Sequence, residues 1–95
     1  MIYVDTLSAR GFAVRGLRVR TCHCFSDQGE DELRAFAQRI GLPTRWLQRR
    51  TVPHFDLTTA WRANALVGGA RELSNRDAAK LWRTMRMTEP RCSGR

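Results

Sequence analysis

The stretch that decides the fold is residues 17–42, LRVRTCHCFSDQGEDELRAFAQRIGL, where a strand pattern leads directly into a helix pattern. Side chains alternate in character along 17–25, which is typical of a strand with two different faces. One face carries Leu17, Val19, Thr21, His23 and Phe25. The other carries Arg18, Arg20, Cys22 and Cys24. We predict a half-buried strand whose arginines face solvent.

The second half of this stretch predicts a helix. Acidic residues crowd its first turn, where the positive end of a helix dipole favours them. Ser26 or Asp27 is the predicted N-cap, and Glu30, three residues after Asp27, resembles a capping box. Apolar residues recur at i, i+3, i+4 and i+7 and form one face: Leu33, Phe36, Ala37 and Ile40. Gly41 is the predicted end of the helix.

Strands and helices alternate on both sides of this unit. Residues 1–4 predict a buried strand, and Gly11 and Gly16 bracket a predicted loop or hairpin turn. Further along we expect a helical turn at 45–48, a strand or extended segment at 54–57, a helix at 60–67, a strand at 71–73 and a helix capped by Ser74, with Ala78, Leu81, Trp82 and Met85 as its apolar face. The order predicts one small α/β domain over 1–87, with a short mixed sheet and about three helices. A basic tail at 88–95 is expected to fray.

Composition excludes several classes of protein. The chain has 95 residues, of which 42% are hydrophobic, so it is neither a disordered tail nor large enough for a second domain. No apolar run approaches the ~20 residues of a membrane span, and Asp5 and Arg10 interrupt any signal peptide. The three cysteines, Cys22, Cys24 and Cys92, are expected to be free thiols in a reducing cytoplasm. A Cys-x-Cys metal clip that includes His23 is the alternative.

Positive charge is concentrated in two acid-free stretches. Seventeen basic residues oppose nine acidic ones, giving a net charge of +8, and 6–26 and 33–55 contain no acid. All but one of the basic residues are arginines, which bind phosphate and carboxylate in bidentate fashion. An anionic partner explains this bias, and so does the arginine-rich composition of a high-GC genome. We interpret the arginines as a surround for a polar site.

Two groups of residues carry candidate chemistry. Polar side chains stand at the ends of predicted strands or in the loops that follow them: Asp5, His23, Asp27, His54 and Asp56. We predict that His54, Asp56 and His23 are catalytic as an acid–base set, and the candidate ligands for a divalent metal are His23, His54, Asp5 and Asp56. Structural roles are open as well: Asp27 as an N-cap, His23 as a core histidine and Asp56 as a turn residue.

The second group suits a nucleotide. An indole, an amide and guanidinium groups can stack on a nucleobase and bind its phosphate, and this stretch contains Trp46, Gln48, Arg49 and Arg50. The alternative is that Trp46 closes the core beneath the first helix. The chain has neither a phosphate-binding glycine loop nor a nucleophile elbow.

Several segments together resemble a known family. They are Tyr3-Val4-Asp5, Cys22-His23-Cys24-Phe25-Ser26-Asp27, Glu32-Leu33-Arg34-Ala35-Phe36-Ala37 with Gly41-Leu42, Trp46-Leu47-Gln48 and Pro53-His54-Phe55-Asp56-Leu57-Thr58, followed by Arg62, Ala65 and Gly69-Ala70. In order and spacing they are similar to the short bacterial and phage proteins known as domain of unknown function 4031. The resemblance covers residues 1–81. It implies that one shared feature contains Asp5, His23, Asp27, Trp46, Gln48, His54, Asp56 and Arg62.

These observations predict a small cytoplasmic protein that binds a phosphorylated ligand, a nucleotide or a nucleic acid (DNA or RNA). The expected ligand-binding residues are Asp5, Trp46, Gln48, Arg49 and Arg62, with Arg62 holding phosphate. Hydrolysis of that ligand, metal-dependent or by His/Asp acid–base chemistry, is one hypothesis. The alternatives are a non-catalytic nucleic-acid-binding module and a phage-type accessory protein that binds a host protein.

Overall fold

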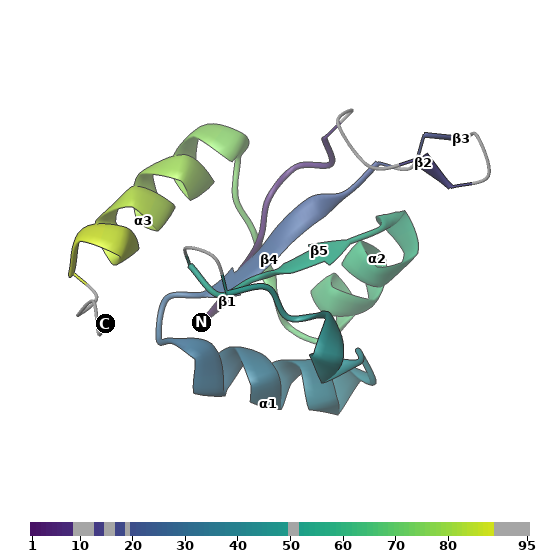
Figure 1. The fold of residues 1–95 in the computed structure, drawn as a ribbon, viewed down its shortest axis with the longest axis horizontal. Coiled ribbons are helices and arrows are strands. Elements are labelled where there is room, and N and C mark those ends of the chain that lie inside the picture. Colours follow the sequence, from purple (N-terminus) through teal and green to yellow (C-terminus); the bar gives the residue numbers. More distant parts are fainter. Residues whose placement is uncertain (9–12, 15–16, 19, 50–51, 89–95) are drawn as a thin grey trace.

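Strand β1 (Ile2–Val4) occupies an inner position of a four-stranded mixed sheet with the order β5-β4-β1-β6. The computed structural model describes residues 1–8, 13–14, 17–18, 20–49 and 52–88. β4 (Cys22–Ser26) pairs antiparallel with β1 and with β5 (Phe55–Leu57), and β6 (Arg71–Glu72) pairs parallel with β1. β2 (Ala13–Val14) and β3 (Leu17–Arg18) form a separate antiparallel pair (Figure 1).

Helices cover both faces of the sheet. α1 (Glu30–Ile40) and α2 (Thr59–Val67) pack on one face, and α3 (Asn75–Thr88) lies against the other (Figure 1). The side chains of β1, β4 and β5 that meet α1 and α2 are Ile2, Val4, Cys22, Cys24, Phe55 and Leu57. Phe25 packs with Trp82 and its neighbours on α3. The predicted single α/β domain with a mixed sheet is confirmed.

The strand predicted at 17–25 is divided between β3 and β4, and its exposure is only partly as predicted. Arg20 is exposed, as expected. Cys22 and Cys24 do share a face, but this face is buried in the core and does not face solvent. The opposite face holds Phe25, which is also fully buried, and His23, which is half-exposed. The alternation therefore separated the two faces correctly. The alternation could not show that helices pack on both faces, because that packing joins residues far apart in the chain.

The first helix begins later than predicted. Its N-cap is Gly29, whose φ of 105° suits glycine, and no side chain caps it. Ser26 instead accepts the backbone N–H of Gln28, and the Asp27 carboxylate lies 3.0 Å from the amino group of Met1. At the other end Gly41 adopts the predicted left-handed conformation, with φ 81°. Both predicted caps of this helix start are thus engaged in other contacts.

The remaining elements follow the predicted order. The helical turn is the 3-10 helix η1 (Thr44–Trp46), and the backbone N–H of Asp77 donates to the Ser74 hydroxyl at 3.0 Å, which confirms the predicted cap of α3. Gly11, Gly16 and residues 89–95 of the expected tail lie outside the described residues. None of the helices in the described part of the chain is both long and apolar enough to cross a membrane.

Candidate functional site

Strand alternation places the candidate acids and histidines on the sheet face that α3 covers. Side chains of odd-numbered residues in β1 and β4 share this face, and His23 stands directly opposite Asp56 in the antiparallel register of β4 and β5. Asp5 follows the last residue of β1, and His54 precedes the first residue of β5. Asp5, His23, His54 and Asp56 are therefore neighbours on three adjacent strands.

Antiparallel pairing assembles this group, although its members were chosen because they stand at strand ends or in the loops that follow. The end of β1 meets the beginning of β4, so Asp5 lies beside His23. Asp27, at the other end of β4, pairs with the amino group of Met1 and lies outside the group. Asp27, which the family resemblance assigned to one feature with these residues, is therefore not part of this cluster.

Asp5 and His23 form a tightly bound dyad. Nδ1 of His23 lies 2.7 Å from Oδ2 of Asp5, and the backbone N–H of His23 donates to Oδ1 at 2.7 Å. The Asp5 carboxylate is buried, while the His23 side chain is 49% exposed. Since the ionised carboxylate only accepts, Nδ1 carries the proton and Nε2 is the nitrogen available to a ligand. The hydrogen bond from Asp5 raises the pKa of His23, against the smaller effect of partial burial.

His54 is buried, although the sequence offered no packing role for it. Its Nδ1 lies 2.8 Å from the carbonyl oxygen of Val52, so this nitrogen donates and Nε2 is unprotonated in the neutral ring. Nε2 lies 3.7 Å from Oδ1 of Asp56. In the neutral ring this nitrogen has no proton to donate, so His54 and Asp56 attract each other only when the imidazole is protonated.

The side chain of Asp56 is held by Gln48. The Gln48 amide donates to Oδ2 of Asp56 at 2.6 Å, and the backbones of Gln48 and His54 exchange two hydrogen bonds of 2.9 Å. These contacts attach the segment after η1 to the start of β5. Gln48, His54 and Asp56, which the family resemblance assigned to one shared feature, therefore lie side by side.

An indole from α3 covers both imidazoles. The Trp82 ring centroid lies 5.4 Å from that of His23 and 5.0 Å from that of His54, and the two imidazole centroids are 5.5 Å apart. Trp82 also meets Phe25 edge-on at 5.3 Å. The sequence analysis assigned Trp82 to the core, and it has that role, but it is also a wall of the site.

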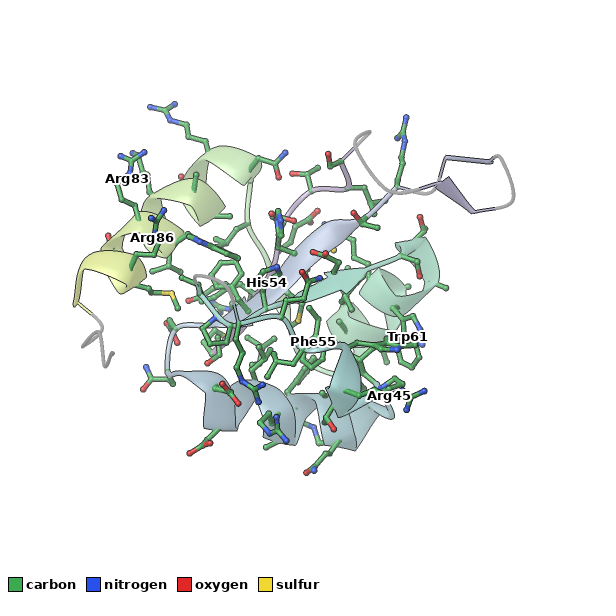
Figure 2. The ribbon with its side chains drawn as sticks, viewed as in Figure 1. Arg45, His54, Phe55, Trp61, Arg83 and Arg86 are labelled. Carbon is green, nitrogen blue, oxygen red and sulfur yellow. The ribbon has the colours of Figure 1, made fainter. Side chains whose placement is uncertain are left out.

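A cleft of about 700 Å³ opens between the sheet and α3. Besides Trp82, its lining includes Asp5, His23, Asp56, Asn75, Arg83 and Arg86. Figure 2 shows Arg83 and Arg86 on α3, with His54 between that helix and the sheet. Both arginines are exposed, and neither forms an ion pair with another described residue. We refer to this hollow as the α3 cleft.

Sequence reasoning missed Arg83, Arg86 and Asn75. It treated the last helix as packing, because its apolar stripe of Ala78, Leu81, Trp82 and Met85 accounts for its pattern. The available signal was Arg83 directly after Trp82, with Arg86 one turn later, at the border of that stripe. Arg83 and Arg86 add positive charge to the cleft, whereas we had looked for it in 6–26 and 33–55. Arg10 and Arg15 of the first stretch lie outside the described residues.

The arginines chosen from the sequence lie elsewhere. Arg49 forms two hydrogen bonds with the carboxylate of Glu30, at 2.9 and 2.8 Å. Arg62 donates from Nε to the backbone carbonyl of Asp5 at 2.9 Å and pairs with Glu72 at 2.6 Å. Neither residue lines the cleft. Arg62 instead holds the chain at Asp5, and Arg50 is outside the described residues.

Trp46 lies at a second, smaller hollow. It is 45% exposed, so it does not close the core beneath α1, and its ring meets Trp61 of α2 edge-on with centroids 6.2 Å apart. This groove of about 490 Å³ is lined by Trp46, Gln48, Asp56, Thr58 and Trp61. We refer to it as the indole groove. Asp56, on the edge strand β5, lines both hollows.

Cys22 and Cys24 are free thiols, as predicted, and both are buried. Burial raises the pKa of each thiol to about 12, which keeps both protonated at neutral pH. They face α1 and α2, whereas His23 lies on the α3 side, so the three do not form a clip. Cys92 lies outside the described residues.

Metal binding by His23, His54, Asp5 and Asp56 stays a prediction of the sequence. Within residues 1–8, 13–14, 17–18, 20–49 and 52–88, no three or more His, Cys, Asp and Glu side chains are arranged to hold a metal ion. What the arrangement provides directly is a carboxylate-oriented imidazole beside guanidinium groups. That combination suits proton transfer next to a bound anion.

Comparison with known proteins places these residues in a family context. No curated protein and no solved structure matches the chain. A family model does match, over residues 2–85, which include the Asp5–His23 dyad, Asp56 and the cleft wall up to Arg83. The chain therefore belongs to the family described as a protein of unknown function (DUF4031).

Proposed function

We propose that this protein binds a phosphorylated ligand, a nucleotide or a nucleic acid, in the α3 cleft and hydrolyses a phosphate ester there. The observation that carries the proposal is the Asp5–His23 dyad in a cleft that Arg83 and Arg86 also line. A carboxylate on Nδ1 fixes the tautomer and makes Nε2 a better base. Guanidinium groups bind phosphate oxygens and stabilise charge that develops on them.

The proposed reaction needs one base and one water molecule. Nε2 of His23 takes a proton from the water as the water oxygen bonds to phosphorus. The bond from phosphorus to the leaving oxygen breaks, and the imidazolium returns the proton to that oxygen. Asp5 stays ionised and stabilises the imidazolium. Arg83 and Arg86 neutralise the phosphate, the Asn75 amide can donate to it, and the Asp56 carboxylate can accept from a hydroxyl or amino group of the ligand.

One substitution tests the catalytic part. His23→Gln is expected to lower the hydrolysis of a generic phosphodiester, such as bis(p-nitrophenyl) phosphate, by about 10²–10⁴-fold, the usual contribution of a general base. The circular dichroism spectrum should be retained, because the His23 side chain is half-exposed and a glutamine amide can still donate to Asp5. Full activity in His23→Gln, or binding of nucleotides without any turnover, would refute the hydrolase proposal.

Salt dependence tests the anion-binding part. Affinity for a nucleotide oligomer should fall steeply with added salt if arginines contact phosphates. Arg83→Gln should weaken binding and reduce the salt slope by about one counterion. Arg76→Gln is the matched control, since Arg76 is an exposed arginine of α3 that does not line the cleft. Equal effects of the two substitutions would show only a general loss of charge.

A further inference from the structure

The indole groove has no part in the reaction proposed for the α3 cleft. Its two aromatic rings come from η1 and α2, and they meet at an interplanar angle of 88°. Trp46 is one of the few large apolar side chains that are exposed among the described residues. An indole left half-open beside a second indole gives a planar ligand two apolar surfaces to contact.

Polar groups surround these rings. The lining includes the Gln48 amide, the Asp56 carboxylate and the Thr58 hydroxyl. Gln48 donates one N–H to Asp56 at 2.6 Å, which orients its amide. A carboxylate accepts and an amide both donates and accepts, so the rim can pair with the edge of a nucleobase. Aromatic surface with a hydrogen-bonding rim suits an unpaired base better than an apolar side chain.

The groove and the α3 cleft share Asp56 as a lining residue. Each hollow has by itself the size of a small-molecule site. Together they accommodate more than one nucleotide unit, with aromatic surface at one end and guanidinium groups at the other. Arg45, exposed and directly before Trp46 in η1, adds positive charge beside the groove (Figure 2). The net charge of +8 also favours a polyanion.

We propose that the ligand is a single-stranded nucleic acid, which stacks one unpaired base in the indole groove while an adjoining phosphate lies in the α3 cleft. This inference rests on the proposed function, because it requires the cleft to bind phosphate. A single strand is required since bases in a duplex are stacked on one another and do not expose their faces. Stacking on aromatic rings tolerates every base, so affinity depends weakly on sequence.

A comparison of two oligomers separates base stacking from phosphate binding. One is a fluorescently labelled single-stranded DNA oligomer, and the other is an abasic oligomer with the same number of phosphates. Anisotropy titrations at low salt are expected to give tighter binding of the oligomer that contains bases. Trp46→Ala should weaken that binding by about 5- to 100-fold and leave the abasic oligomer unaffected. Trp46→Phe, which keeps an aromatic ring, should retain most of the wild-type affinity for the oligomer that contains bases.

Two controls guard against unspecific effects. Val67→Ala removes an apolar side chain that is 90% exposed and outside the groove, so it should change neither affinity. Arg83→Gln should weaken both oligomers alike, because it acts on phosphate. Melting temperatures of all variants establish that they are folded.

The outcomes distinguish the two proposals. Equal affinity for both oligomers, or an unchanged affinity in Trp46→Ala, would overturn the base-binding inference and leave the phosphate site intact. Failure of both oligomers to bind at low salt would overturn the proposed function as well. A third outcome is that Trp46→Ala abolishes the binding of an uncharged apolar peptide and leaves the affinity for the oligomers unchanged. This would assign the groove to a protein partner and also overturn the inference.

Discussion

The Asp5 carboxylate accepts two hydrogen bonds from His23, one from the ring Nδ1–H and one from the backbone N–H, each at 2.7 Å. Arg62 in turn donates to the Asp5 backbone carbonyl at 2.9 Å. The dyad is thus fixed to β1, β4 and α2 at once. This rigidity is what an imidazole needs in order to present Nε2 in one orientation.

Asp5→Asn should lower the pKa of His23. The hydrogen bond from Asp5 is the largest cause that raises this pKa, and an amide has no charge to stabilise the imidazolium. The ring proton shifts of His23, followed by NMR between about pH 5 and 8, should show a lower midpoint in the variant. Asp31→Asn removes an exposed acid of α1 and is the charge-matched control. An unmoved midpoint in Asp5→Asn would contradict the proton assignment.

The same pair predicts how stability depends on pH. The folded pKa of His23 lies above its unfolded value of about 6.5, so the charge-dependent part of the stabilisation is complete below that pH. It is lost as the pH rises through the raised folded pKa. The difference in unfolding free energy between wild type and Asp5→Asn should therefore shrink with rising pH in urea titrations. A difference that is constant across this range would indicate that only uncharged hydrogen bonds contribute.

Trp82→Ala should destabilise the fold and disturb the site together. Trp82 contacts Phe25, His23 and His54. Removing a fully packed aromatic side chain lowers the free energy of unfolding by about 3–5 kcal/mol. The loss should be smaller here, because Trp82 is only partly buried. Trp82→Phe should cost less, since it keeps an aromatic contact. Urea unfolding measures both, and Lys80→Ala, at an exposed position of α3, is the control. A stability loss no larger than that of Lys80→Ala would mean that α3 docks without this indole.

Ser74→Ala should destabilise α3 by about 0.5–2 kcal/mol, because the backbone N–H of Asp77 loses its hydroxyl acceptor. Ser74→Asn, which keeps a capping oxygen, should retain most of the stability. Thermal unfolding of the three proteins provides the comparison. If the Ser74→Ala and Ser74→Asn variants have the same melting temperature, the observed hydrogen bond does not stabilise the helix.

Cys22 and Cys24 should resist alkylation in the folded protein. Both are buried, and burial raises their thiol pKa to about 12, so the reactive thiolate is scarce. In a Cys92→Ser background, mass spectrometry after iodoacetamide treatment should detect no adduct until urea unfolds the chain, when two adducts should form. Rapid labelling of the native protein would show that this face of the sheet opens easily.

Local features of the fold could be predicted because short-range physics controls them. The apolar stripe of α1, its end at Gly41 and the Ser74 cap of α3 all follow from residues within a few positions of one another. The start of α1 was wrong for the opposite reason. Ser26 and Asp27 are good capping residues, but their side chains bond to Gln28, Glu32 and the amino group of Met1.

The sequence by itself determined which side chains share a strand face, because the period of two is a property of the backbone. The alternation placed His23 with Phe25, and the same period puts Asp5 on the face of Tyr3 and Asp56 on the face of His54, although these candidates were chosen because they stand at strand ends. Tertiary structure alone decided the rest. The docking of α3 over this face buried His54 and brought Arg83 and Arg86 into the cleft, and the pairing of Arg49 and Arg62 with Glu30 and Glu72 kept those two out of it. Such contacts join residues far apart in the chain, and no local pattern specifies them.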